Sequence, residues 1–399
     1  MERVAKEQAD KIEYSGICLI AFLGLPIHGK EGESLYHPEE LEPPRRGIRY
    51  IYSLSRKISI QQQLKDLKKI GVRPIRYLHQ LGMLIGERDD YQILEEPAEF
   101  SSEPDICVTI TEPFAQKTIS PKMILPWGVE KIQAPKVWKW SRGKGIRVAV
   151  IDTGISSYHP ALQRNYRGGI NILSPYYEPE DYNGHGTHVA GIIAGRFTEL
   201  GLIGVAPKAF IYAVKAFNRR GSANLSDLLA AIDWCVDKRM NIINMSFGMR
   251  NVSDSLRRAV QIAYRKGIIM VAATGNQGNQ MQIDYPARYP ETISVGSISS
   301  QEKISSFCNT DGNVDLYAPG EKIISSWLGG GIKEMSGTSM AVPHVSGTIA
   351  LLLYLNRQLS VEQIRYLLVR SASKIKGTER SRIVNAYGAI KLSQQVMHW

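Results

Sequence analysis

Four apolar runs in the C-terminal two thirds of the chain constrain its fold most strongly. They are residues 148–151 (VAVI), 211–217 (IYAVKAF), 240–247 (MNIINMSF) and 268–273 (IIMVAA), and helical patterns at 226–238, 252–266 and 342–355 alternate with them. Apolar runs of this kind are typical of strands that are buried on both faces, and strands that alternate with helices form parallel sheets. From Arg147 onward we therefore predict an α/β fold, a doubly wound and mainly parallel sheet with helices on both faces.

The N-terminal part of the chain has a different pattern. Residues 29–46 are polar and rich in proline, which predicts a linker. Strand-like and helical segments then follow in the order β-α-β-β-α-β, at 49–54, 60–70, 72–84, 89–96 and 106–111. We predict a leader and linker at 1–46, a small α+β domain at 47–117 and the large α/β domain at 118–399.

The basic residues are concentrated in the large domain. Lys and Arg number 49 against 38 Asp and Glu, for a net charge of +11. Residues 118–399 carry 33 basic and 19 acidic side chains (net +14), whereas residues 1–117 carry 16 and 19 (net −3). A basic surplus is compatible with nucleic-acid binding, but these side chains are scattered and lack the interleaved aromatic residues of such modules. We therefore expect no nucleic-acid partner.

One apolar segment bears on localisation. Residues 16–27 (GICLIAFLGLPI) are too few to span a bilayer as a helix, but they suit the core of a signal peptide. The residues before them include four acids, and no A-x-A cleavage site follows. Secretion or attachment to the cell envelope is one interpretation, and a buried segment of a cytoplasmic protein is the other. No later run predicts a stable membrane span.

Three polar segments contain candidate catalytic residues. Asp152 follows the strand VAVI, at the edge where parallel sheets build their sites, although a helix-capping role is also open. His185 begins a helical stretch in NGHGTHVAG, with His188 one turn later; a zinc site is disfavoured because no HExxH glutamate accompanies them. Ser339 lies in SGTSMAVPH, where Pro343 suits a first helical turn and backbone N–H groups favour developing negative charge.

Together these side chains supply what acyl transfer requires. Ser339 would attack a carbonyl, His185 would accept and return its proton, and Asp152 would orient the imidazole and stabilise its cation. Asn276 follows the strand IIMVAA in the sequence TGN. Its amide, with the Ser339 backbone N–H, would stabilise the oxyanion.

The motifs DTG, HGTHVAG, NMSFG, TGNQGN and GTSMAVPH, in this order, resemble those of the subtilisin-like serine proteases. The resemblance extends from about Ile124 to Trp399. It implies a hydrolase, a serine endopeptidase acting on polypeptides, with Asp152, His185 and Ser339 as the catalytic triad and Asn276 as the oxyanion donor. His188 and His344 would then be structural. Residues 47–112 are similar in pattern and position to the family's propeptide, which serves as a folding chaperone and an intramolecular inhibitor.

The resemblance also implies subsites for the substrate. Ser246, Phe247 and Gly248 would form the edge strand that pairs with an extended chain. The S4 pocket, which receives the fourth residue before the cleaved bond (P4), would be apolar. It would be lined by Leu225, Leu228 and Phe247, whereas Ala273 and Gly275 would form a wall of the S1 pocket. Asp284 stands where the family usually has a small residue, so a carboxylate at the base of S1 would favour Lys or Arg at the position before the cleaved bond (P1).

The resemblance predicts a zymogen that processes itself. Residues 114–117 (FAQK) offer an apolar P4 residue and a basic P1 residue. We therefore predict cleavage after Lys117, with Lys122 as the second candidate.

The family's strong calcium site is not matched. Its acid, nine residues after the triad aspartate, is replaced by Ala161, and Thr198 in 196–202 (RFTELGL) stands where an amide ligand is usual. We expect no cofactor for catalysis and no metal at this site, with a structural calcium elsewhere left open. We also expect a monomer. The competing hypothesis is a catalytically silent member of the family that acts by binding.

Overall fold

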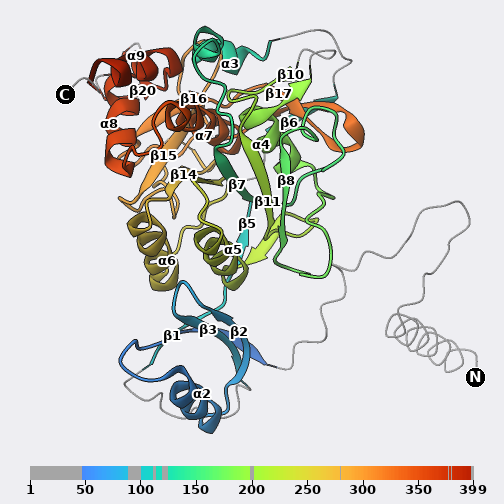
Figure 1. The fold of residues 1–399 in the computed structure, drawn as a ribbon, viewed down its shortest axis with the longest axis vertical. Coiled ribbons are helices and arrows are strands. Elements are labelled where there is room, and N and C mark those ends of the chain that lie inside the picture. Colours follow the sequence, from blue (N-terminus) through green and yellow to red (C-terminus); the bar gives the residue numbers. More distant parts are fainter. Residues whose placement is uncertain are drawn as a thin grey trace, which may run out of the picture. The chain divides into compact units, whose positions relative to one another are not determined.

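The computed structural model describes residues 47–88, 100–110, 114–118, 125–197, 202–278, 280–375, 377–378 and 380–396 (Figure 1). The apolar segment 16–27, the predicted helix at 89–96, Lys122 and Thr198 lie outside these residues.

A small antiparallel sheet forms the N-terminal part. Its elements are β1 (Ile48–Ser53), α2 (Ile60–Lys69), β2 (Arg73–Leu78), β3 (Met83–Arg88) and β4 (Ser101–Pro104), and the strand order is β2-β3-β1-β4. Ser59 caps α2, since its side chain accepts a hydrogen bond from the Gln62 N–H. Leu67 of α2 packs on Tyr52 and Leu84 of the sheet, and all three are almost fully buried. The small α+β unit is therefore confirmed, although its last strand is β4 and not 106–111.

The described residues of the C-terminal part form a sheet of nine strands. In sheet order these are β19 (Ser373–Lys374), β20 (Arg382–Ile383), β16 (Leu316–Pro319), β15 (Thr292–Ile298), β14 (Ile269–Ala273), β13 (Ile242–Met245), β7 (Arg147–Asp152), β11 (Phe210–Lys215) and β8 (Tyr166–Asn171). All neighbours pair in parallel except β19 and β20. The prediction of a mainly parallel sheet is confirmed.

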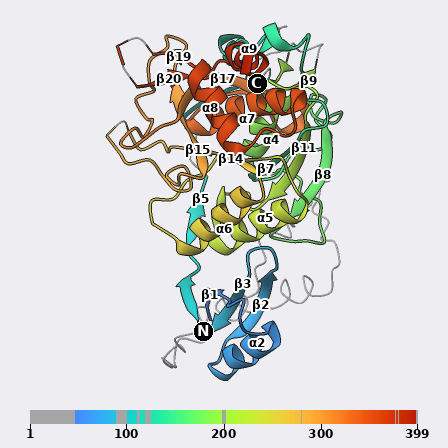
Figure 2. The same cartoon turned by 60° about the vertical axis from the view of Figure 1, so that its left-hand side comes forward.

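Helices cover both faces of this sheet (Figures 1 and 2). They are α3 (Trp127–Lys131), α4 (His185–Ala194), α5 (Leu225–Asp237), α6 (Asp254–Arg265), α7 (Thr338–Leu355), α8 (Val361–Ser371) and α9 (Ala386–Val396), with short 3₁₀ turns at Ala134–Val137 and Leu328–Gly330. Successive side chains of a strand point to opposite faces. Accordingly, Val148 and Val150 of β7 pack in one core with α4 and α7, whereas Ala149 and Ile151 pack in a second core with α5 and α6.

Helix α7 is the central helix of the first core. Among the described helices it alone is long and apolar enough to cross a membrane, and 89% of that stretch is buried inside the protein. The helix begins at Thr338, four residues before the predicted start, so Pro343 lies inside it and not in its opening residues.

Short strands complete the fold. β5 (Cys107–Thr109) pairs with β12 (Ser222–Asn224), and β9 (Arg196–Phe197) pairs with β10 (Leu202–Ile203). β17 (Ile323–Ser326), β18 (Ile332–Ser336) and β6 (Phe114–Thr118) form a third small sheet. The segment predicted as the last strand of the N-terminal domain thus pairs with the C-terminal part, because its apolar side chains Val108 and Ile110 are buried in the second core.

Carboxylates attach the N-terminal sheet and the strand after it to α5 and α6. Glu103 accepts hydrogen bonds from the Ser253 hydroxyl (2.6 Å) and from the Asp254 and Ser255 N–H groups at the start of α6. Asp105 does the same for Ser226 at the start of α5, from its N–H (2.8 Å) and its hydroxyl (2.7 Å). The first N–H groups of a helix lack partners within the helix, and negative charge is favoured there.

We expect Glu103→Ala to lower the free energy of unfolding of the N-terminal sheet by about 1 kcal/mol, the typical cost of losing a cap. Hydrogen exchange should become faster at the Asp254 and Ser255 amides. Asp66→Asn in α2 is the matched control, because the partners of Asp66 are the neighbouring Gln62 and Lys69. Unchanged exchange at the start of α6 would contradict the capping role.

Candidate active site

Asp152 and His185 meet at the carboxyl edge of the main sheet. Asp152 is the last residue of β7 and His185 the first residue of α4, and His185 Nδ1 donates to Asp152 Oδ1 over 2.7 Å. Each side chain is 1% exposed. The glycine in HGTH permits this approach, since a Cβ at Gly186 would lie 2.1 Å from the Gly154 carbonyl oxygen and 3.1 Å from Asp152.

The charge of Asp152 controls the His185 imidazole. Burial by itself favours the neutral ring, but the charge of Asp152, its hydrogen bond and the charge of Asp181 outweigh burial and raise the pKa of His185. Because Nδ1 carries the proton that faces Asp152, Nε2 presents its lone pair. Nε2 is buried and has no hydrogen-bond partner among the described residues.

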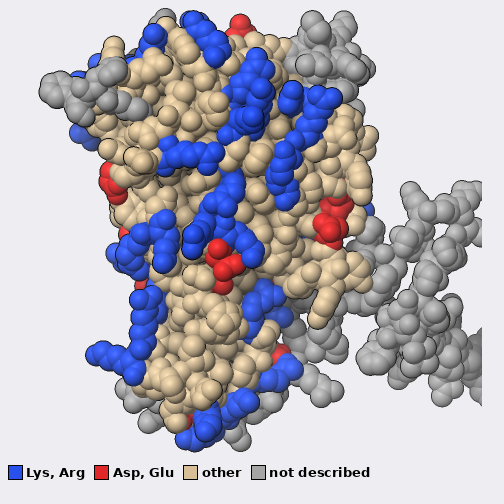
Figure 3. Space-filling model, viewed as in Figure 1, with Lys and Arg blue, Asp and Glu red and all other residues tan. Residues whose placement is uncertain are grey.

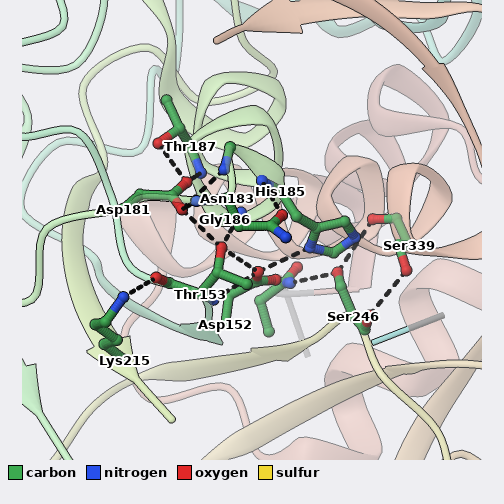
Figure 4. A network of polar contacts seen from close by, with 12 residues as sticks. Asp152, Thr153, Asp181, Asn183, His185, Gly186, Thr187, Lys215, Ser246 and Ser339 are labelled. Atoms are coloured by element: carbon green, nitrogen blue, oxygen red, sulfur yellow. Dashed lines mark hydrogen bonds and ion pairs between the residues drawn. The ribbon is translucent and has the colours of Figure 1, made fainter. Parts of the chain in front are cut away.

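Ser339 lies on the other side of the ring. Figure 4 shows His185 between Asp152 and Ser339, with one ring nitrogen toward each. Ser339 is the second residue of α7 and is fully buried. Its Oγ donates to the Ser246 carbonyl oxygen (2.8 Å), and the Ser246 Oγ donates to the Ser339 carbonyl oxygen (3.0 Å).

Pro343 accounts for the second of these bonds. In an α-helix the N–H of residue 343 would donate to the carbonyl of residue 339, but proline has no N–H. The Ser339 carbonyl is thereby left for Ser246. The Asn244 side chain donates to the Ser246 Oγ (2.9 Å) and itself accepts from Ser346 (2.8 Å). Sequence reasoning missed Asn244, whose only signal was its place in the motif NMSFG.

Asn276 lies in the loop after β14, and its orientation is fixed. Its side-chain oxygen accepts hydrogen bonds from the Thr338 N–H (2.9 Å) and the Thr338 hydroxyl (2.8 Å). The residue is therefore tied directly to the neighbour of Ser339, at the start of α7.

A further carboxylate, Asp181, binds the loops around Asp152 and His185. It is 3% exposed and accepts hydrogen bonds from five donors: Thr153 Oγ1 (2.9 Å), the Asn183 and Gly184 N–H groups (both 2.9 Å), and the N–H (2.9 Å) and hydroxyl (2.7 Å) of Thr187. Sequence reasoning missed this residue as well.

The predicted S4 residues pack together with Val108 of β5 and with Ile110. Leu225, Leu228 and Phe247 are buried in one apolar cluster with Val108 and Ile110. Ile110 forms an antiparallel bridge with Phe247, and its N–H donates to the Gly221 carbonyl (2.8 Å). Ile110 thus lies on the edge that was predicted to bind an extended chain, whereas residues 107–109 pair with β12.

Asp284 lies close to Gly248 of the predicted edge strand and to Gly275 of the predicted S1 wall. A Cβ at Gly248 would come 2.7 Å from the Asp284 Cβ, and a Cβ at Gly275 would come 2.5 Å from Asp284 Oδ2. Asp284 is 3% exposed. Burial raises the pKa of this carboxyl to about 6, although the charge of Arg250 and a hydrogen bond from Gln277 act in the opposite direction.

His188 and His344 make contacts of a structural kind. His188 Nε2 donates to the Ile323 and Lys333 carbonyl oxygens, and His344 Nδ1 donates to the Met340 carbonyl. Burial lowers the pKa of His188 to about 3 and that of His344 to about 4, so both rings stay neutral at physiological pH.

Ala161 has apolar surroundings. Ala161 is fully buried in an apolar cluster with Leu202 and Ile332. Within the described parts of the chain, no three or more His, Cys, Asp or Glu residues lie together in a group that could hold a metal ion.

Comparison with known proteins identifies the family. The model of the subtilase family matches residues 143–389. An intracellular serine protease of Paenibacillus polymyxa is 43% identical over 236 residues, which are 57% of this chain and 72% of the relative. Subtilisin Savinase of Lederbergia lenta is 39% identical over 270 residues (67% and 99%), and subtilisin E of Bacillus subtilis is 35% identical over 306 residues (75% and 77%). The chain therefore belongs to the subtilase family and is a subtilisin-like serine endopeptidase that acts on polypeptide substrates.

Proposed function

We propose that Asp152, His185 and Ser339 are the catalytic triad of this endopeptidase, and that the chain is made as a zymogen that processes itself. The observation that carries the proposal is the buried contact of Asp152 with His185 Nδ1, which leaves Nε2 as a base facing Ser339.

The reaction follows the acyl-enzyme route. The Ser339 hydroxyl turns from the Ser246 carbonyl to Nε2 of His185 and gives up its proton as Oγ attacks the substrate carbonyl. His185 then protonates the leaving amine, while Asp152 stabilises the imidazolium. A water molecule, deprotonated by the same histidine, hydrolyses the ester.

Asn276 is proposed as the oxyanion donor together with the Ser339 N–H. Two hydrogen bonds from Thr338 hold the Asn276 side-chain oxygen, which sets the plane of the amide before substrate binds. Fixed donors of this kind are worth about 10²–10³ in rate, a figure that was itself measured in a subtilisin.

Ser339→Ala should abolish both self-processing and proteolysis. The full chain should stay intact by mass analysis, and kcat should fall by about 10⁶-fold, the loss known from a subtilisin. Ser371→Ala is the control, because Ser371 is a helical serine of α8 whose hydroxyl bonds the Leu367 carbonyl. A Ser339→Ala chain that is still cut in a pure preparation would rule out the assignment, as would a wild type that does not react with a serine-directed covalent probe.

We propose that residues 47–117 act as the propeptide. The support is the bridge of Ile110 to Phe247, the burial of Val108 and Ile110 against the predicted S4 residues, and the attachment of Glu103 and Asp105 to α6 and α5. Basic side chains predominate on the face drawn in Figure 3, but residues 47–117 carry 10 basic and 10 acidic side chains, so net charge is not part of this support. The mature enzyme is proposed to begin at Thr118, after cleavage at Lys117, or at Met123, after cleavage at Lys122.

For the mature enzyme we propose an apolar P4 preference and a basic P1 preference. Leu225, Leu228 and Phe247 hold Val108 and Ile110 of the propeptide, so a bound peptide would meet the same apolar surface. The P1 preference rests on the Asp284 carboxylate close to Gly248 and Gly275.

The P1 preference should depend on the ionisation of Asp284. Because the pKa of Asp284 is raised to about 6, the carboxyl is neutral below that pH and charged above it. The ratio of kcat/KM for a Lys substrate to that for a Phe substrate should therefore rise as the pH increases through 6. The ratio removes the titration of His185, which affects both substrates equally.

Asp284→Asn should lower this ratio by at least about tenfold at pH 8, which is a modest ion-pair contribution of about 1.4 kcal/mol, and should remove its pH dependence. Asp311→Asn, an exposed residue whose backbone carbonyl bonds the Ile283 N–H, is the control. A preference for large apolar P1 residues that Asp284→Asn leaves unchanged would contradict the basic pocket.

A further inference from the structure

The chain that leads into β7 is basic and aromatic. Residues 131–151 contain six basic and no acidic side chains, and their middle part, 136–144, reads KVWKWSRGK. This stretch differs from the expectation that the basic side chains are scattered without interleaved aromatic residues. The Ala386 N–H at the start of α9 donates to the Ile132 carbonyl (2.8 Å), so α9, which has Lys391 and no acid, lies against the same stretch. Basic side chains gather at the upper end of Figure 3, where Figure 1 shows α3 and α9.

An aromatic pair joins the two segments. The rings of Trp140 and Tyr387 stack, with their centroids 6.1 Å apart and their planes at 23°. Lys139 Nζ lies 4.3 Å from the centroid of Trp140. Lys391 Nζ lies 5.1 Å from that centroid and 5.9 Å from the centroid of Tyr387. Two lysines from distant parts of the chain thus share one aromatic support.

Two more cations are held in the same way. Lys136 Nζ lies 5.7 Å from the Tyr387 centroid, and the guanidinium carbon of Arg142 lies 5.8 Å from that of Trp138. All four cations are exposed, whereas the three rings are half-buried. In the part of the chain that the structure describes, no carboxylate forms an ion pair with any of these cations. We call this set the basic-aromatic surface: Lys136, Trp138, Lys139, Trp140, Arg142, Tyr387 and Lys391.

The rings prepare these cations for an external anion. A cation over an aromatic face is attracted by the ring, and its remaining N–H groups stay available to an oxygen acceptor. Because the ring already limits its movement, such a side chain loses less conformational freedom on binding than an unsupported lysine. The basic-aromatic surface is therefore suited to a partner that presents several negative groups.

The surface lies far from the nucleophile. Ser141, between Trp140 and Arg142, donates from its Oγ to the Leu351 carbonyl (2.8 Å), near the carboxyl end of α7. Ser339 is the second residue of α7 and Leu355 is the last. At 1.5 Å per residue, these two ends are about 24 Å apart. A partner on the basic-aromatic surface would leave the active site uncovered.

The state of the rings decides which anionic partner fits. Single-stranded nucleic acid is bound by ring faces on which its bases can stack. The faces of Trp140 are already occupied by Lys139, Lys391 and Tyr387. Tryptophan, tyrosine and lysine together are instead typical of proteins at the interface of a bilayer.

Exposed apolar side chains at the same end of the molecule also favour a bilayer. Leu355 at the end of α7 is 36% exposed and Val396 at the end of α9 is 39% exposed. These two helix ends meet, because Asn356 and Val396 line one hollow together with Leu359. Apolar side chains beside basic ones suit the boundary between head groups and acyl chains.

We propose that the basic-aromatic surface docks the enzyme on the anionic head groups of a phospholipid bilayer, with the active site turned away from the bilayer. The enzyme then lies on the membrane without a spanning helix. The inference does not depend on the proposed self-processing, because residues 136–144 and 386–396 stay in the chain after cleavage at either predicted position.

Co-sedimentation with vesicles tests this docking on the full-length Ser339→Ala chain. The chain should sediment with vesicles of equal parts phosphatidylcholine and phosphatidylglycerol but not with phosphatidylcholine alone, and salt should weaken the binding. Lys136→Gln, Lys139→Gln and Lys391→Gln together should lower the affinity by about a hundredfold, since each lysine near an anionic surface contributes about fivefold. Lys139→Gln alone, with a loss of about fivefold, serves if the triple variant does not fold.

Two matched triple variants are the controls. Arginine at the same three positions keeps the charge and should preserve the affinity. Lys57→Gln, Lys65→Gln and Lys68→Gln remove the same charge from exposed lysines of the N-terminal part and should have a much smaller effect. Residues 16–27 are present in every variant, so any binding by that apolar segment cancels in the comparison. A parent chain that does not sediment with anionic vesicles, or equal losses in the two glutamine variants, would overturn the proposal.

Activity tests the orientation. Wild-type enzyme on the anionic vesicles should hydrolyse a soluble peptide with the kcat/KM that it has in free solution, because Ser339 lies at the other end of α7. A loss of activity on the vesicles that the triple glutamine variant does not show would overturn this orientation. Binding of single-stranded DNA that needs the same lysines, without binding to vesicles, would assign the surface to nucleic acid and overturn the proposal. An enzyme that is inactive in solution would contradict the proposed triad and leave the sedimentation result decisive for docking.

Discussion

The arrangement of the site depends on the burial of a parallel sheet on both faces. Because β7, β13 and β14 are neighbours, their carboxyl ends meet at one edge of the sheet. Asp152 ends β7, Ser246 follows β13 and Asn276 follows β14 after a short loop. Helices α4 and α7, which cover one face, begin at that same edge, where His185 is the first residue of α4 and Ser339 the second residue of α7. Residues far apart in the chain are thus brought together by strand order and helix direction.

The main sheet could be predicted because its central strands are continuous apolar runs, whereas a strand with one face in water alternates apolar and polar residues. The four runs at 148–151, 211–217, 240–247 and 268–273 became β7, β11, β13 and β14. Asp152, His185 and Ser339 could be proposed from their motifs, and they do meet. The predicted start of α7 was wrong because Pro343 was interpreted as a first-turn proline. Pro343 instead lies inside the helix, and the Ser339 carbonyl that its missing N–H would have bonded accepts from the Ser246 hydroxyl.

Other features depend on contacts that the local sequence does not encode. An alternating pattern at 106–111 indicates a strand but not its partner, so the pairing of β5 with β12 could not be predicted. Asp181 is one acid among several in its loop. Its importance arises only when Thr153, 28 residues earlier, is folded against it. The place of β6 on β18 likewise depends on tertiary structure, since residues 114–118 carry no motif beyond an apolar and a basic end.

The reciprocal bonds between Ser246 and Ser339 have a mechanical consequence. Two residues that exchange two hydrogen bonds are characteristic of paired antiparallel strands, and here two hydroxyl groups reproduce that pattern between the end of a strand and the start of a helix. The bond from the Ser246 Oγ does not use the Ser339 hydroxyl, so it can hold the strand edge to the core helix while that hydroxyl turns to His185. Because α7 is buried in the centre of the protein, this bond fixes the strand edge at Phe247 relative to Ser339.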